Sequence, residues 1–174
     1  MKGGSGSVRS FVLRFALAFV ALELLVFLVL WHPTLFQPYA ELNASGTAAL
    51  FAPWIDGIRG MGNYLVSPGF SILVKPGCDA YQPAAVLVAG VVAFPASRGR
   101  KWLGAVAGVG ILLALNVLRL GALMWTGLHH RDSFDSMHLE VLPGVYLLVA
   151  LGLWLAWSWW ARAPSLRKDP TSAG

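Results

Sequence analysis

Charge and cysteine are both scarce in this chain of 174 residues. Charged residues make up only 12% of it and hydrophobic residues 57%, and the mean hydropathy is +0.65. Soluble domains carry about 25% charged residues, and a soluble domain this short cannot bury so much apolar surface. The composition therefore excludes an ordinary soluble domain and indicates a polytopic membrane protein, with the lipid bilayer as the solvent for much of the chain.

Several motifs that build known kinds of site are also missing. Cys78 is the single cysteine, which excludes an intrachain disulfide framework and a CxxC redox pair. The sequence has no glycine-rich phosphate loop and no paired metal-ligand motif, so we expect no cofactor and no metal. The net charge of +5 is small and follows the predicted topology, so we do not expect nucleic acid as a partner.

Four hydrophobic stretches are the candidate membrane spans. They cover residues 11–31, 79–96, 102–127 and 141–161. The shortest has 18 residues, and at 1.5 Å per residue it reaches about 27 Å, which just crosses a hydrocarbon core. No signal-peptide cleavage site follows the first stretch, which we interpret as a retained anchor. The predicted fold class is all-α, with about four transmembrane helices in a single domain, 11–161, between tails at 1–10 and 162–174.

The connection 32–77 contains five prolines and mixes apolar with polar residues. Within it we expect an interfacial helix over residues 47–66, because Asp56, Arg59 and Asn63 recur at helical spacing between apolar residues. The sequence leaves open whether this helix lies flat on the membrane or enters it. Residues 70–74 are expected to form a short extended run.

Basic residues are distributed unevenly between the two sides of the predicted spans. Most lie in the two tails and in the loop between the second and third spans, at Lys2, Arg9, Arg98, Arg100, Lys101, Arg162, Arg167 and Lys168. The two connections on the other side, 32–77 and 128–140, have only Arg59, Lys75 and Arg131. The positive-inside rule therefore predicts a multi-pass protein of the cytoplasmic (inner) membrane, with both termini in the cytoplasm.

Three reactive side chains lie near the outward ends of predicted spans. Cys78 comes just before the second span, Arg119 lies within the outer part of the third, and His138 comes just before the fourth. A cation favours the thiolate form of a cysteine, an imidazole can take and return its proton, and a guanidinium can hold an oxyanion. Because helix ends at one membrane face can converge, these three are the candidate catalytic residues.

Two further residues are candidates for supporting roles. Glu23 lies at about the depth of Arg119 and is its candidate ion-pair partner, in a catalytic or a purely structural pair. Asn116 precedes Arg119 by one helical turn, so it either orients the guanidinium or joins helices. Plainer interpretations also apply: Cys78 can be an inert filler, and His129 and His130 compete with His138 for any role.

A set of motifs in the second half of the chain resembles the exosortase/archaeosortase family. Gly77-Cys78 precedes an apolar helix that ends in Ala93-Phe94-Pro95, and a basic turn follows. The next span contains LNVLRL at 115–120, and Phe134 and His138 open the last span. The resemblance covers about residues 70–160. Its most specific part is the Asn-x-x-Arg pattern inside a hydrophobic span, and the small size is most similar to the compact exosortase H branch.

This resemblance implies a membrane cysteine transpeptidase or protease whose Cys, Arg and His fall on Cys78, Arg119 and His138. Its expected partners, besides the bilayer, are exported proteins that end in a short motif, a hydrophobic helix and a basic cluster. The chain departs from the family at Asp79-Ala80, where many members have Ser-Gly, and most members are longer, with about twice the spans. The alternative is a non-catalytic membrane subunit or assembly factor.

Overall fold

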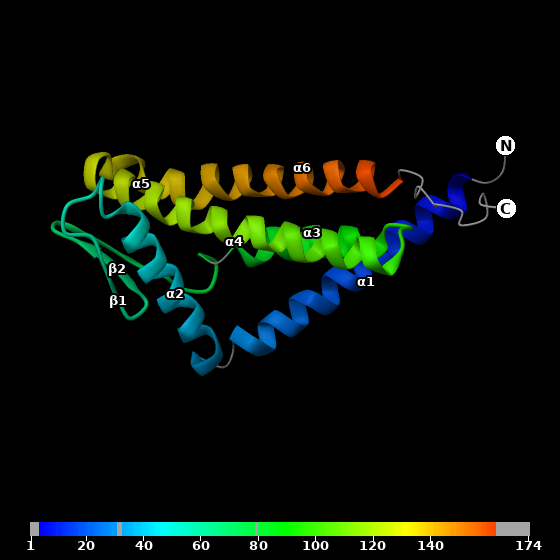
Figure 1. The fold of residues 1–174 in the computed structure, drawn as a ribbon, viewed down its shortest axis with the longest axis horizontal. Coiled ribbons are helices and arrows are strands. Elements are labelled where there is room, and N and C mark those ends of the chain that lie inside the picture. Colours follow the sequence, from blue (N-terminus) through cyan, green and yellow to red (C-terminus); the bar gives the residue numbers. More distant parts are fainter. Residues whose placement is uncertain (1–3, 31–32, 79, 163–174) are drawn as a thin grey trace, which may run out of the picture.

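The computed structural model describes residues 4–30, 33–78 and 80–162 (Figure 1). The longer helices are α1 (Gly4–Leu30), α2 (Pro33–Phe51), α3 (Tyr81–Ala93), α4 (Arg98–His129) and α6 (Leu142–Arg162). Three short turns join α4 to α6: η1 (Arg131–Ser133), α5 (Phe134–Ser136) and the π-helical η2 (Met137–Val141). The strands are β1 (Arg59–Met61), β2 (Tyr64–Ser67) and β3 (Phe70–Leu73).

The nearly all-helical architecture confirms the predicted fold class. Among the described residues, three helical segments are long and apolar enough to cross a membrane: Val8–Leu28, Arg98–His129 and Arg131–Arg162. The protein is therefore a membrane protein. The second predicted span, 79–96, is shorter than expected, because α3 has 13 residues and measures about 20 Å. Asp79, the first residue of this predicted span, lies outside the described residues, and Ala80 before the helix is left-handed, with φ 52°.

The prediction of an interfacial helix over 47–66 is wrong. Helix α2 starts earlier and ends at Phe51, and residues 59–73 form an antiparallel sheet in the order β1-β2-β3. The physical reason lies in the glycines: Gly57, Gly62 and Gly69 all have positive φ and make turns that a helix cannot contain. The extended run expected at 70–74 is confirmed as β3.

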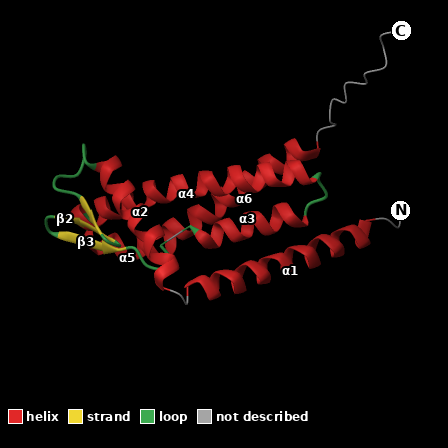
Figure 2. Cartoon of the chain, turned by 60° about the horizontal axis from the view of Figure 1, so that its bottom comes forward, coloured by secondary structure: helices red, strands yellow, loops and turns green. Residues whose placement is uncertain are grey.

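The helices form an elongated bundle with two different ends (Figures 1 and 2). The sheet, α2 and α5 lie at one end, which we call the sheet end. The start of α1, the connection between α3 and α4, and the end of α6 lie at the other, which we call the tail end. Helix α3 is central, since it packs on α1, α4 and α6. The arrangement places the residues before α3 where α4 and η2 can reach them.

Candidate functional site

Cys78 lies in the turn that leads from β3 into α3. Gly77 has φ 96° and Ala80 has φ 52°, so left-handed residues lie on both sides of it, and its N–H donates to the Lys75 carbonyl at 2.9 Å. The side chain is 1% exposed and belongs to the same apolar cluster as Leu65 and Leu120. The thiol is thus held in a tight, buried turn at the sheet end.

His138 lies next to this thiol, although the two residues are 60 positions apart in the sequence. Its Nε2 lies 3.9 Å from Cys78 Sγ, and its ring stacks on Phe134 with centroids 5.7 Å apart. The residue sits in η2, and one-turn π-helices of this kind are frequent at functional sites. This distance is near the upper limit for a hydrogen bond to sulfur. Within the described ranges, the buried Nδ1 has no hydrogen-bond partner.

Arg119 brings a cation to the cavity beside the cysteine turn. It is only 7% exposed, and its guanidinium lies over the Tyr146 ring at 5.6 Å. Among residues 4–30, 33–78 and 80–162, nothing bonds to its Nε. A buried cation without a full set of acceptors is costly inside a membrane protein, and such residues commonly act on a ligand or substrate.

Asn116 joins three parts of the fold. It is fully buried, and its Nδ2 donates to Asn43 Oδ1 and to the Cys78 carbonyl, both at 3.0 Å. The carbonyl can only accept, so this bond fixes which way the amide points. Asn116 therefore ties α4 to α2 and to the turn of Cys78. In the described structure it makes no bond to Arg119, and its Oδ1 is left without a partner.

Glu23 does not form the ion pair with Arg119 that equal depth suggested. It accepts a hydrogen bond from the Tyr81 hydroxyl, which ties α1 to the start of α3. Both Glu23 and Arg119 nevertheless line one cavity of about 360 Å³. Gly77 and Ala80, which bracket the cysteine turn, line it too.

The competing histidines lie apart from the thiol. His129 stacks on Trp125 at 4.1 Å and its Nδ1 lies 3.0 Å from the Trp125 carbonyl. His130 directly follows the last residue of α4, and the side chains of His129 and His130 are both exposed. Of the three histidines in this region, the structure brings only His138 to Cys78.

Sequence reasoning missed three polar residues at the site: Asn43, Tyr81 and Tyr146. Asn43 is 6% exposed and its Nδ2 donates to the Tyr39 carbonyl at 2.8 Å. The Tyr146 hydroxyl donates to the Leu112 carbonyl at 3.3 Å. The available signal was a polar side chain in an apolar helix, which must find a partner when buried.

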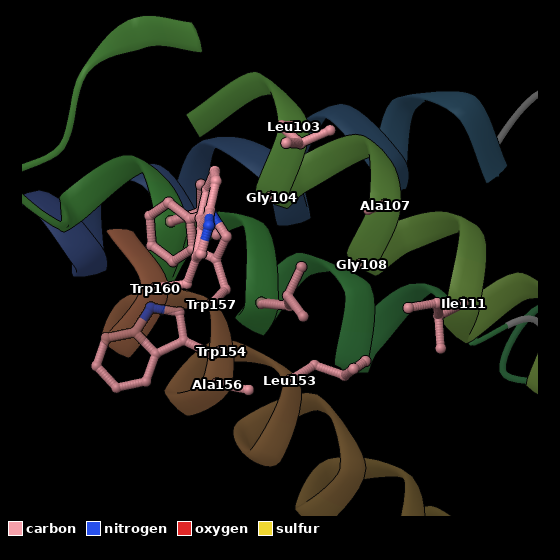
Figure 3. A pocket seen from close by; sticks show the side chains of 12 residues that line it. Leu103, Gly104, Ala107, Gly108, Ile111, Leu153, Trp154, Ala156, Trp157 and Trp160 are labelled. Carbon is pink, nitrogen blue, oxygen red and sulfur yellow. The ribbon is translucent and has the colours of Figure 1, made fainter. Parts of the chain in front are cut away.

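A second cavity, between α4 and α6 near the tail end, has a different character (Figure 3). It measures about 270 Å³, and Trp154, Trp157 and Trp160 gather on one side of it opposite Gly104 and Gly108. Its lining is apolar apart from the indole nitrogens, so it offers no group for acid–base or nucleophilic chemistry.

Among the described residues, no three His, Cys, Asp or Glu side chains gather as metal ligands would. Comparison with protein-family models, with curated proteins and with solved structures gives no match to this chain.

Proposed function

We propose that this protein is a membrane-embedded cysteine transpeptidase or protease of the exosortase kind. The observation that carries the proposal is the contact between Cys78 Sγ and His138 Nε2 at 3.9 Å, between residues 60 positions apart in the chain. A thiol beside an imidazole is the pair that nucleophilic acyl transfer requires. The buried Arg119, which resembles the third member of the family's site, lines the adjoining cavity.

In the proposed reaction, His138 Nε2 takes the Cys78 proton and the thiolate attacks a peptide carbonyl carbon. Arg119 stabilises the oxyanion of the tetrahedral intermediate. His138 then returns the proton to the leaving nitrogen, the C–N bond breaks, and an amine departs, leaving a thioester on Sγ. An amine or water attacks the thioester next, and its proton passes through His138 back to the thiol.

The proposed orientation puts the sheet end outside the cytoplasmic membrane and both termini in the cytoplasm. It is supported by the start of α4, which contains Arg98, Arg100 and Lys101 and lies at the tail end together with the end of α6. The proposed substrates are exported proteins with a C-terminal motif, a hydrophobic helix and a basic cluster. Their cleavage sites would meet Cys78 at the outer face.

A second candidate function is a non-catalytic membrane subunit. The observation that favours it is the 1% exposure of Cys78, whose side chain packs in an apolar cluster as an inert thiol would. The two functions differ in what removal of the thiol does. A subunit would tolerate Cys78→Ala, since the change in volume is small.

The first prediction tests the nucleophile. Cys78→Ala should abolish shortening of a co-expressed protein that carries the C-terminal signal, because no thioester can form. Cys78→Ser should be nearly inactive, since a hydroxyl is much harder to deprotonate than a thiol. The measurement is the intact mass of the exported protein. A shortened product with Cys78→Ala would remove Cys78 from the catalytic role.

Matched histidine variants control for general damage. His138→Ala should lower processing by about 100-fold or more, the usual contribution of a general acid–base group. His129→Ala and His130→Ala should stay close to wild type, because both side chains are exposed and away from the thiol. Arg119→Lys should also be impaired in processing, because an ammonium lacks the planar fork of donors that a guanidinium has.

A further inference from the structure

A slot runs along the bundle between α1 and α6, with α3 as its floor. At the sheet end it is the 360 Å³ cavity that Glu23 and Arg119 line. Toward the tail end it continues as an apolar cavity of about 230 Å³. Val86 of α3 lines both cavities, so the two adjoin. Helices α1 and α6 approach each other near the tail end, where the Phe11 and Trp154 rings lie 6.0 Å apart, and diverge toward the sheet end (Figure 1).

One side of α1 follows the slot along its length. Phe11 and Phe15 line the apolar part, and Phe19 and Glu23 line the part beside Arg119. The phenylalanine rings stack in succession, with centroids 6.4 and 6.1 Å apart. The spacing of four residues keeps these side chains on one helix face, and the stripe is about 18 Å long. It is an apolar lane that ends in a carboxylate.

The head of the slot is built for a polar ligand. Arg119 is more than nine-tenths buried there, and in the described part of the chain its Nε has no partner. Glu23 and the Tyr81 hydroxyl lie beside it. Gly77 and Ala80 place this head directly against the turn of Cys78.

From these features we propose that the slot is the docking groove for the membrane-spanning helix of a substrate polypeptide. The inference rests on the function proposed above and names the surface that positions its substrate. The first turns of the helix lie along Phe15 and Phe19 with the N-terminal end at Glu23, and the rest of it passes over the Phe11–Trp154 contact that narrows the slot at the tail end. The extended residues before the helix then pass Arg119 and reach Cys78.

The charges at the head select this occupant over an anionic lipid. The N-terminus of a helix carries a partial positive charge and free N–H groups, which a carboxylate stabilises. The carbonyl groups of an extended peptide are acceptors for a guanidinium. A lipid phosphate would meet Arg119 favourably but would be repelled by Glu23, whereas a peptide that leads into a helix suits both groups.

Two glycines of α6 offer a matched test. Gly144 lines the head of the slot, and a Cβ built on it meets nothing within 4 Å. Gly152 lies on the same helix, is exposed, and also has nothing within 4 Å of such a Cβ. Gly144→Trp therefore fills the slot with little disturbance to the fold, and Gly152→Trp adds the same side chain elsewhere.

The experiment reconstitutes the full chain in phosphatidylcholine vesicles. The probe is a synthetic peptide with a polar start and about 18 leucine and alanine residues, enough to span a bilayer, and one photoreactive residue early in the helix. We expect cross-links to α1 and α6 at the slot. Gly144→Trp should lower their yield by about tenfold or more, as expected from overfilling a site, and Gly152→Trp should leave it unchanged.

The outcomes separate the groove from the catalytic assignment. Cys78→Ala should cross-link like wild type, because docking does not need the thiol. Equal yields from both tryptophan variants would overturn the groove, even if processing depends on Cys78. Labelling of the slot by a photoreactive phospholipid but not by the peptide would overturn it as well. Retained cross-linking with a Cys78→Ala protein that still processes substrate would overturn the proposed function alone.

Discussion

Three residues around the cysteine turn each bury a polar atom that has no partner among the described residues. The atoms are Asn116 Oδ1, Arg119 Nε and His138 Nδ1. Most buried polar groups in proteins are bonded, so a group of exceptions at one place calls for an explanation. Under the proposed function, a bound substrate would complete the hydrogen bonds of these atoms. Asn116 also makes a hydrogen bond that fixes the local geometry, because its Nδ2 donates to the Cys78 carbonyl.

The bonds of Asn116 give a prediction about stability. Asn116→Ala removes the donor to Asn43 Oδ1 and to the Cys78 carbonyl. Each unsatisfied buried group costs about 1–3 kcal/mol, so Asn116→Ala should cost more than Asn43→Ala. The double variant should lose less than the sum, since the two residues share a bond. Thermal unfolding in detergent measures this, with Asn63→Ala in the turn between β1 and β2 as the control.

The helices of the sheet end are joined through glycines of α4. A Cβ on Gly121 would lie 2.1 Å from the Phe51 ring of α2, and one on Gly127 would lie 2.0 Å from the Phe70 ring of β3. Small residues let membrane helices approach closely without a hydrophobic driving force. The end of α2 and the short β3 therefore pack on α4 through the Phe51 and Phe70 rings, which occupy the space that a side chain at Gly121 or Gly127 would fill.

A bulky residue at such a position should separate these elements. We expect Gly121→Leu to lower stability by about 1–3 kcal/mol, the usual cost of overpacking. Gly110→Leu is the control, because a Cβ there meets nothing within 4 Å on the same helix. Adding Phe51→Ala to the Gly121→Leu variant should restore part of the lost stability, because removal of the Phe51 ring makes room for the leucine. Equal melting temperatures for both leucine variants would show that α2 does not rest on Gly121.

The whole molecule has a polar, irregular end and a basic, helical end. The candidate site lies at the first, together with the sheet and α2. The first turn of α4, with Arg98, Arg100 and Lys101, lies at the second. In the proposed orientation the basic start of α4 lies on the cytoplasmic side, as the positive-inside rule predicts. The candidate site then lies on the opposite side of the membrane.

This orientation can be tested with two fusions. A reporter that is active only outside the cytoplasm should be inactive when fused after Gly174. The same reporter inserted at Gly62, in the open turn between β1 and β2, should be active. The reverse pattern would place the site in the cytoplasm and exclude exported proteins as its substrates.

Hydropathy was sufficient to predict the fold class, because apolar stretches of this length have few other uses. It was insufficient for residues 47–66. Asp56, Arg59 and Asn63 recur at helical spacing there only by coincidence, because the chain makes turns at Gly57 and Gly62. Short segments allow either period. The left-handed conformation of a glycine decides between them, and it is visible only in the structure.

The candidate site, too, could be predicted only in part from the sequence. The positions of Cys78 and His138 near helix ends at one face predicted their approach, which the structure shows. Glu23 was matched to Arg119 by depth alone. Counting residues along a span gives depth, but the direction of a side chain around the helix axis depends on how the helices pack. That direction leads Glu23 to Tyr81 instead. The catalytic roles of Cys78, Arg119 and His138 stay predictions.

The π-helical turn at Met137–Val141 gives one residue of this chain an unusual importance. A π turn holds one residue more than the α turn it replaces. The wider turn takes up this extra residue without turning the flanking helix, so α5 and α6 keep the relative orientation that one continuous α-helix would give them. What changes is the direction of the side chains inside the turn, and His138 is one of them. A deletion of one residue at this place would therefore leave both flanking segments where they are and redirect the imidazole that faces the thiol.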